Sequence, residues 1–310
     1  MLKKSLKQEF QYGIYSKTYF YILLFLTLLF SIISFINYNA VTDSYNEFLY
    51  TVDYYEENNL NIEEDLEKDY NVSDEEDLIE NPIAYSKDRV SRYIYTASPK
   101  YAGIQFLEAS FSFFPIVFGM LGLSVAVSDY KYKTIKIKSV RENKRNIGLA
   151  KQVSLVISSF IILISSLILS YFINFYFYYQ IVKKIPVTEF NSFNIESDNN
   201  IFLGFIFAYI ISIIFSNIGY TLGILFKNIY IGIIFLSIYN FIMPNLGVFD
   251  FKNSLYYIGN RIFNFYGVVD LEIATKASTL PISIVVLFCI FIISFIINIF
   301  IITKRSSFES

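Results

Sequence analysis

The chain has 310 residues, of which 55 % are hydrophobic and only 17 % charged, with a net charge of −2 and a mean hydropathy of +0.47. A soluble domain carries about 25 % charged residues, so the composition argues against an ordinary soluble protein. The chain holds no His and a single cysteine, Cys289. These counts exclude His-dependent catalytic triads, His-based zinc motifs and an internal disulfide.

Residues 1–18 predict a cytoplasmic helix that lies in the membrane interface. Leu2, Leu6, Phe10 and Ile14 recur at helical spacing, while the lysines fall between them. A charged leader that only sets the topology is the alternative. The apolar run that follows is longer than the 7–15-residue core of a signal peptide, and no good cleavage site follows it, so we expect a retained first span.

Long apolar runs predict an all-α membrane protein with six transmembrane helices. A crossing needs about 20 apolar residues, and backbone amides inside lipid must be bonded within their own segment, which favours helices over strands. The predicted spans are 19–36, 106–128, 153–178, 201–226, 227–243 and 280–303.

Residues 37–105 form an acidic external insert with sixteen acidic and five basic residues. Helices are expected over 44–57 and 84–95, with a turn at Asn81–Pro82. The ligand order of a calcium-binding EF-hand loop is absent, so a solvated loop is favoured over a calcium site. A negatively charged surface that attracts cationic cargo is a third interpretation.

The distribution of Lys and Arg predicts that both termini are cytoplasmic. The terminal segments, the 129–152 loop and the short turn after 226 hold fifteen basic and four acidic residues, whereas the other side holds ten basic and twenty-three acidic residues. Within that loop a short helix is expected over 144–151, capped by Asn143. The loop over 179–200 is then external, and the tail over 304–310 is cytoplasmic.

The connection over 244–279 is too apolar for a loop in water, so we expect an external re-entrant element with one or two short helices. Asn253, Asn260 and Arg261 are expected to face its interior. The six spans thus combine with an N-terminal interfacial helix, an acidic external insert and this element before the last span.

Small residues predict close helix packing at Gly119, Gly122 and Ala126 of the second span and at Gly219 and Gly223 of the fourth. Packing within one chain is favoured over a dimer contact.

Ionisable groups are nearly absent from the spans, which argues against a proton-coupled or ion-coupled carrier. Neutral polar residues instead mark a candidate cargo pathway for amphipathic or lipid-like molecules: Asn174, Asn217, Tyr220, Asn240 and Asn298. No Gly is followed by Lys, so the chain lacks a phosphate-binding loop for ATP.

Asp129, Thr134, Arg145 and Lys151 stand at the spacing of a motif in the permeases of type-2 ABC exporters, and the chain resembles that family. The family pattern has Gly where this chain has Lys133 and Gly where it has Ala150, and it places a Pro where residues 140–146 have none. The layout of a basic N-terminal helix, six spans and a re-entrant element also resembles the family.

The resemblance implies that two permeases, identical or closely homologous, assemble with two ATPase subunits in a bacterial plasma membrane. The loop between the second and third spans then acts as a coupling helix that docks on the ATPase. The residues to which this role is assigned are Arg141, Glu142, Asn143, Lys144, Arg145 and Asn146. The chain itself would be non-catalytic and bind no cofactor, with ATP and Mg on the partner ATPase.

The size, the insert and the richness in Ile, Asn, Lys and Tyr resemble small exporters of Gram-positive bacteria. Some of these export amphipathic peptides such as phenol-soluble modulins, and others give immunity to antimicrobial peptides. The implied partners are the ATPase, a second permease and membrane lipid, without nucleic acid. An ATPase-independent channel, sensor or scaffold that uses the acidic ectodomain is the alternative.

Overall fold

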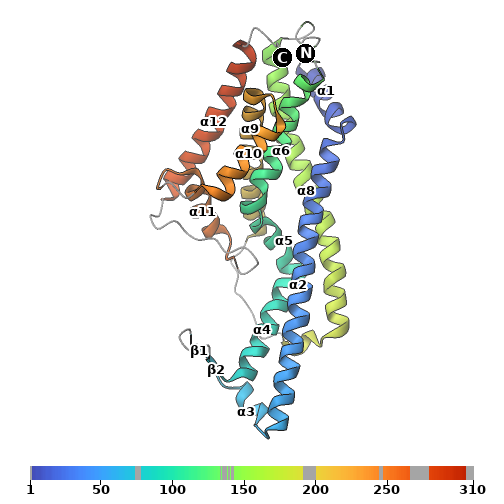
Figure 1. Ribbon diagram of the computed structural model, residues 1–310, viewed down its shortest axis with the longest axis vertical. Helices are drawn as coiled ribbons and strands as arrows, with labels where there is room; N and C mark the ends of the chain where they lie inside the picture. The colour runs from blue at the N-terminus through green and yellow to red at the C-terminus, as the bar shows by residue number, and fades with distance from the viewer. Residues whose placement is uncertain are drawn as a thin grey trace. The chain divides into compact units, whose positions relative to one another are not determined.

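The computed structural model describes residues 2–73, 78–132, 134, 138, 140, 143–190, 200–243, 247–265 and 279–304. Apart from one two-stranded ribbon, the regular structure of these residues is helical (Figure 1). Five helices are long and apolar enough to cross a membrane: α2 (Thr18–Glu57), α6 (Ser110–Lys131), α8 (Lys144–Lys184), α9 (Ile201–Phe226) and α12 (Leu280–Lys304). The chain is therefore an all-α membrane protein.

The predicted span over 227–243 is not matched by a helix of full length. Helix α10 (Ile229–Ser237) has nine residues and continues as a five-residue π-helix, η2 (Ile238–Ile242). At ~1.5 Å per residue the pair covers ~21 Å, less than the ~30 Å of a hydrocarbon core. Five of the six predicted crossings are thus confirmed as helices of sufficient length.

Two helices extend well beyond the predicted spans. Helix α2 continues past residue 36 to Glu57, and α8 begins at Lys144 and ends at Lys184. The predicted helices over 44–57 and 144–151 are confirmed as helical, but their extents were too short, because each is part of a longer continuous helix. No Gly or Pro interrupts residues 37–57, and α8 meets a proline only at Pro186, so nothing in either sequence stops the helix earlier.

The described chain divides into two units, of which unit 2 comprises Leu28–Gln105 and Ile168–Asp198. Its core is a cluster of apolar side chains from α2, α8, α4 (Pro82–Ala97) and the 3-10 helix η1 (Val187–Phe190). The buried members are Val41, Val90, Ile94, Ala97, Ile181, Ile185 and Phe190. The Ser91 hydroxyl donates to the Phe190 carbonyl at 2.5 Å, which fixes η1 on α4.

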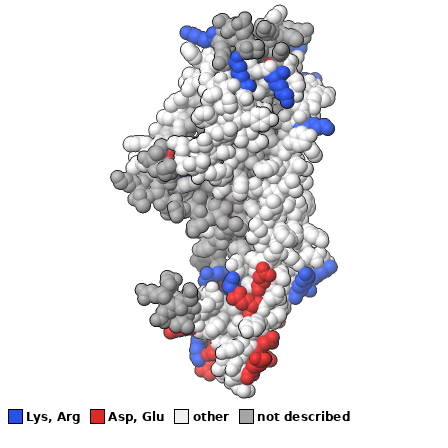
Figure 2. Space-filling model, in the orientation of Figure 1, with Lys and Arg blue, Asp and Glu red and all other residues white. Residues whose placement is uncertain are grey.

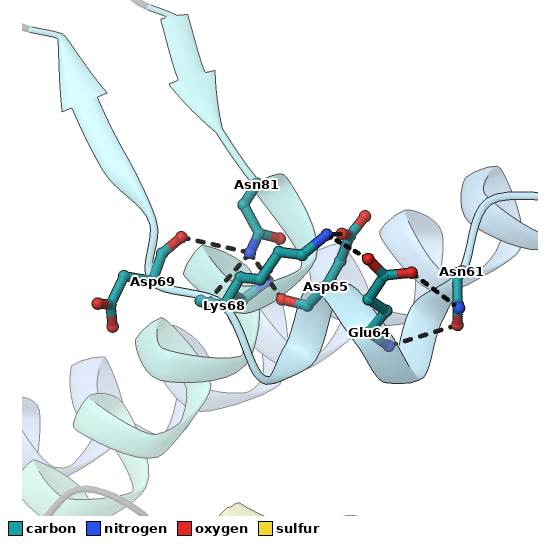
Figure 3. A network of polar contacts seen from close by, with 7 residues as sticks. Asn61, Glu64, Asp65, Lys68, Asp69 and Asn81 are labelled. Carbon is teal, nitrogen blue, oxygen red and sulfur yellow. Dashed lines mark hydrogen bonds and ion pairs between the residues drawn. The ribbon is translucent and has the colours of Figure 1, made fainter.

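Unit 2 also holds α3 (Ile62–Leu66), a ribbon of β1 (Asn71–Ser73) and β2 (Leu78–Glu80), and most of α5 (Pro99–Glu108). The Asn81 side chain donates to the carbonyls of Asp65, Lys68 and Asp69 at 2.6, 3.2 and 3.5 Å (Figure 3). Its Oδ1 caps α4 by accepting from the Ala84 amide, which confirms the predicted turn at Asn81–Pro82.

Acidic residues are densest over residues 63–77 of the insert, which we call the acidic block. Ordinary polar contacts hold its described residues. Lys68 pairs with Glu64 at 2.9 Å and with Asp65 at 3.0 Å, and these contacts hold the pKa of the Lys68 ammonium above its usual value (Figure 3). Among the described residues no group of His, Cys, Asp or Glu is arranged to hold a metal ion. Residues 74–77, the second half of the block, lie outside the described residues.

Unit 1 comprises Met1–Thr27, Phe106–Leu167 and Asn199–Ser310. Its most extensive helix contact is between α6 and α9. A Cβ on Gly122 would overlap the Ser216 carbonyl, and one on Gly219 would overlap the Gly119 carbonyl. The two predicted small-residue faces therefore pack on each other within one chain, as expected.

One short helix lies in the predicted re-entrant element. Helix α11 (Phe251–Ile262) is capped by the Asp250 side chain and packs on α12 and α9. Asn253 is buried and Asn260 half-buried, but Arg261 is exposed beside Tyr257, so the expected inward orientation of Arg261 was wrong. Residues 244–246 and 266–278 lie outside the described residues.

Candidate functional site

One wall of the candidate site is the face of helix α1 (Leu2–Tyr15) that packs against the rest of the protein. The buried residues of α1 are Ser5, Glu9 and Gly13, one helical turn apart. Gly13 is required here because a Cβ would overlap the ring of Tyr19. The apolar stripe is open at its two ends, with Leu2 42 %, Ile14 63 % and Tyr15 81 % exposed, whereas Phe10 in its middle is half-buried against the ring of Tyr19. The most deeply buried contacts of α1 are thus made by polar and small side chains.

Four charged side chains of unit 1 form a chain of alternating sign. The Lys138 Nζ lies 2.6 Å from Glu9 Oε1 and 2.9 Å from Asp129 Oδ1. The Lys151 Nζ lies 2.7 Å from the second oxygen of Asp129. We call Glu9, Lys138, Asp129 and Lys151 the charge chain. It joins α1, α6, α8 and the connection between α6 and α8.

Neutral groups complete the coordination of this charge chain. The Thr134 hydroxyl donates to Asp129 Oδ1 at 2.7 Å, and Lys151 donates to the carbonyl of Val125 at 2.8 Å. The Lys138 ammonium also lies 5.2 Å from the centre of the Tyr12 ring, which is within cation–π range. Partial burial raises the pKa of the Tyr12 hydroxyl, and the Asp129 carboxylate raises it further.

Burial of the charge chain costs desolvation free energy, because its four charges are removed from water. The exposed fractions of the side chains are 1 % for Asp129, 4 % for Lys151, 7 % for Glu9 and 18 % for Lys138. Two acids and two bases leave no net charge, so each buried ion has a partner. Removing one member of a buried pair typically costs about 3–5 kcal/mol, because the other charge stays buried without compensation.

The charge chain contains residues that the sequence had singled out. Asp129, Thr134 and Lys151 were named for their resemblance to a motif of exporter permeases, and the structure brings them together. Arg145, the fourth motif residue, is exposed and does not take part. Glu9 and Lys138 were not recognised. The regular spacing of Ser5, Glu9 and Gly13 was the available signal for a second, polar face on α1.

The residues assigned to ATPase coupling are placed in part. Asn143 caps α8 by accepting from the Arg145 amide at 3.0 Å, which confirms the predicted cap. Asn143 and Arg145 are exposed, and Lys144 and Asn146 are half-buried. Arg141 and Glu142 lie outside the described residues. The first turn of α8 therefore presents polar and basic groups to the surroundings.

The candidate cargo-pathway residues do not converge on one cavity in the described part of the chain. Asn174 belongs to unit 2 and donates to the Ala97 carbonyl at 3.3 Å, whereas the other four belong to unit 1. Asn298 donates to the backbone of Asn217 at 3.5 Å. Tyr220 is buried nearby on α9, and Asn240 donates to the Ser112 carbonyl at 2.9 Å.

Two cavities flank α1 instead, and Glu9 and Tyr12 line both of them. The larger cavity, about 410 Å³, lies between α1 and the α6–α8 connection and reaches Lys4, Thr134 and Lys138. The smaller, about 170 Å³, is bounded by side chains of α1 and α6 and by Ile229.

Basic side chains surround this site. On the visible face, Lys and Arg gather at the end of unit 1 where α1 lies, and acidic side chains gather on unit 2 (Figures 1 and 2). The two described carboxylates near α1, Glu9 and Asp129, are neutralised within the charge chain. The outer surface of this region is therefore cationic.

Comparisons with protein-family models, with curated proteins and with solved structures find no match for this chain.

Proposed function

We propose that this chain is the permease subunit of an ATP-driven ABC exporter. The observation that carries the proposal is the meeting of Asp129, Thr134 and Lys151 in a buried cluster. Asp129 lies near the end of α6, Thr134 on the charged connection and Lys151 on α8. The contacts among them would explain why the exporter motif contains these residue types, because together they fix the connection to α6 and α8.

The charge chain would make α1, α6, the start of α8 and the α6–α8 connection move as one rigid body. A partner that pushes on the start of α8 would act on helices already joined by buried ion pairs. Rigid-body motion of packed helices is a common way to convert binding at one place into opening at another. In this mechanism Lys144, Arg145 and Asn146 dock on the ATPase, while Asp129 and Lys151 transmit the displacement to the spans.

The finer topology belongs to the same proposal. Both termini lie in the cytoplasm of a bacterium, and the α10–η2 helix contributes a sixth, shorter crossing of the plasma membrane. The exposed Leu2, Ile14 and Tyr15 support an interfacial position of α1, since such side chains favour the headgroup boundary. The part of unit 2 that lies beyond the predicted spans is then external, in line with its acidic residues.

The complete exporter contains two permeases, identical or closely homologous, and two ATPase subunits that bind ATP and Mg. Its cargo is an amphipathic peptide or another hydrophobic molecule. This cargo is inferred from the resemblance to the family, because Asn217, Tyr220 and Asn298 are buried in the helix packing. An ATPase-independent channel, sensor or scaffold remains the competing function, and unit 2 with its own core favours it.

The test is purification of the full chain in mild detergent with any ATPase that accompanies it. We expect Arg145→Glu to reduce by about tenfold the stimulation of the partner's ATP hydrolysis by this chain. The reason is that the substitution reverses an exposed charge at the proposed docking surface. Lys183→Glu is the matched control, since it makes the same charge change at the other end of α8, where the side chain is also exposed. Equal activity of both variants, or purification without an ATPase, favours the competing function.

A further inference from the structure

The larger cavity beside α1 has the dimensions and chemistry of a binding site. Its volume of about 410 Å³ lies within the ~300–1,000 Å³ of small-molecule sites. Lys4, Gln8, Gln11 and Tyr15 follow one another at spacings of three or four residues, so a single face of α1 forms one wall. Thr134 and Lys138 lie on the other side.

The charges around the cavity favour an anion. Glu9 is the acidic residue that lines it, and Lys138 already neutralises that carboxylate at 2.6 Å. Among the described lining residues, the Lys4 ammonium therefore remains as a net positive charge at the cavity wall. The amides of Gln8 and Gln11 and the hydroxyl of Tyr12 add hydrogen-bond donors of the kind that phosphate oxygens accept.

The apolar surroundings indicate that the anion carries hydrocarbon. Tyr15, at one edge of the cavity, is exposed next to the exposed Ile14, and Ile147 lies in the opposite wall. A free phosphate ester would leave the exposed Ile14 and Tyr15 side chains without an apolar partner. A phospholipid places its phosphate among the donors and its acyl chains along the apolar edge.

We propose that this cavity binds the phosphodiester headgroup of an anionic phospholipid. The lipid would bridge α1 and the α6–α8 connection next to the charge chain. The proposal does not depend on an ATPase partner, and its failure would leave the exporter proposal untouched.

The experiment is calorimetric titration of the purified full chain with dihexanoyl phosphatidylglycerol, a water-soluble anionic lipid. Lys4→Gln should weaken binding about fivefold, the equivalent of ~1 kcal/mol for one basic residue near an anionic lipid. Lys3→Gln is the matched control, because Lys3 is exposed on the same turn of α1 but does not line the cavity. We expect Lys3→Gln to bind like the unaltered chain.

Two further ligands test whether binding needs a net anionic headgroup and whether it needs acyl chains. Dihexanoyl phosphatidylcholine and glycerol 3-phosphate should both bind at least fivefold more weakly than the phosphatidylglycerol. Equal binding of phosphatidylcholine would overturn the requirement for a net anionic headgroup, and equal binding of glycerol 3-phosphate would overturn the requirement for acyl chains. An equal loss in Lys3→Gln and Lys4→Gln would show attraction to the surface rather than to the cavity and would also overturn the proposal.

Discussion

Asp129 holds the centre of the buried charges in unit 1, because one of its oxygens lies near Lys138 and the other near Lys151. Without that carboxylate, two ammonium groups would share a region with only Glu9 as a counter-charge. Such a residue is difficult to replace, since Asn matches its shape but not its charge. Its role is to position the helices, and nothing in the site requires it to react.

We expect Asp129→Asn to destabilise the protein by about 3–5 kcal/mol, measured as a lower midpoint of thermal unfolding in detergent. Glu64→Gln is the control, because its partner Lys68 is on the surface and such exposed pairs contribute about 0–1 kcal/mol. Adding Lys151→Met to Asp129→Asn should recover part of the loss by removing a buried, uncompensated charge. Equal effects of Asp129→Asn and Glu64→Gln would contradict the burial argument.

The sequence motif predicted part of this site. Asp129, Thr134 and Lys151 were singled out by the resemblance to the exporter motif, which did not itself predict that they meet. The sequence could not show that Glu9 joins them, because that contact is made over 129 positions of the chain and depends on the packing of α1. The apolar stripe of α1 drew attention away from the polar face that carries Glu9.

At the scale of elements, the crossing of α6 and α9 depends on glycine. The backbones approach so closely at Gly122 and Gly219 that carbonyl groups occupy the space of a side chain. Close approach allows extensive van der Waals contact, which is the main attraction between helices in lipid. Small-residue spacing predicted close packing at these positions within one chain, but not which two helices pair.

Gly122→Ala should therefore force α6 and α9 apart and lower the thermal unfolding midpoint by several degrees, since the backbone of Ser216 cannot move aside cheaply. Gly148→Ala is the matched control in another helix. Its new methyl group would meet the end of the flexible Ile302 side chain at 3.0 Å, and alanine favours helix over glycine by ~1 kcal/mol. A Gly122→Ala protein as stable as Gly148→Ala would disprove the close crossing.

Helix lengths were less predictable than helix positions. An apolar window locates the part of a helix that suits hydrocarbon, but it does not detect a helix that continues into polar sequence. Helix α2 carries on through Asp43, Glu47 and Asp53 because no residue in that stretch breaks it. The short α10–η2 helix shows the converse, since its apolar run changes to π-helical geometry near its end.

At the scale of the whole molecule, the two units differ in chemistry. Unit 1 contains the charge chain, the tight α6–α9 crossing and a cationic surface around α1. Unit 2 has a separate apolar core and carries most of the acidic residues that the structure describes. An excess of Lys and Arg marks the cytoplasmic side of membrane proteins, so the composition of the units predicts their orientation.

The account depends most on the start of α8 facing the cell interior, where an ATPase can reach it. Helix α8 offers a direct measurement, because Arg145 and Lys183 are exposed near its two ends. In a Cys289→Ser background, Arg145→Cys and Lys183→Cys would each be treated in intact cells with a membrane-impermeant maleimide. We predict labelling of Lys183→Cys in intact cells and of Arg145→Cys only after lysis. Labelling of Arg145→Cys from outside, with Lys183→Cys protected, would contradict the orientation and with it the proposed function.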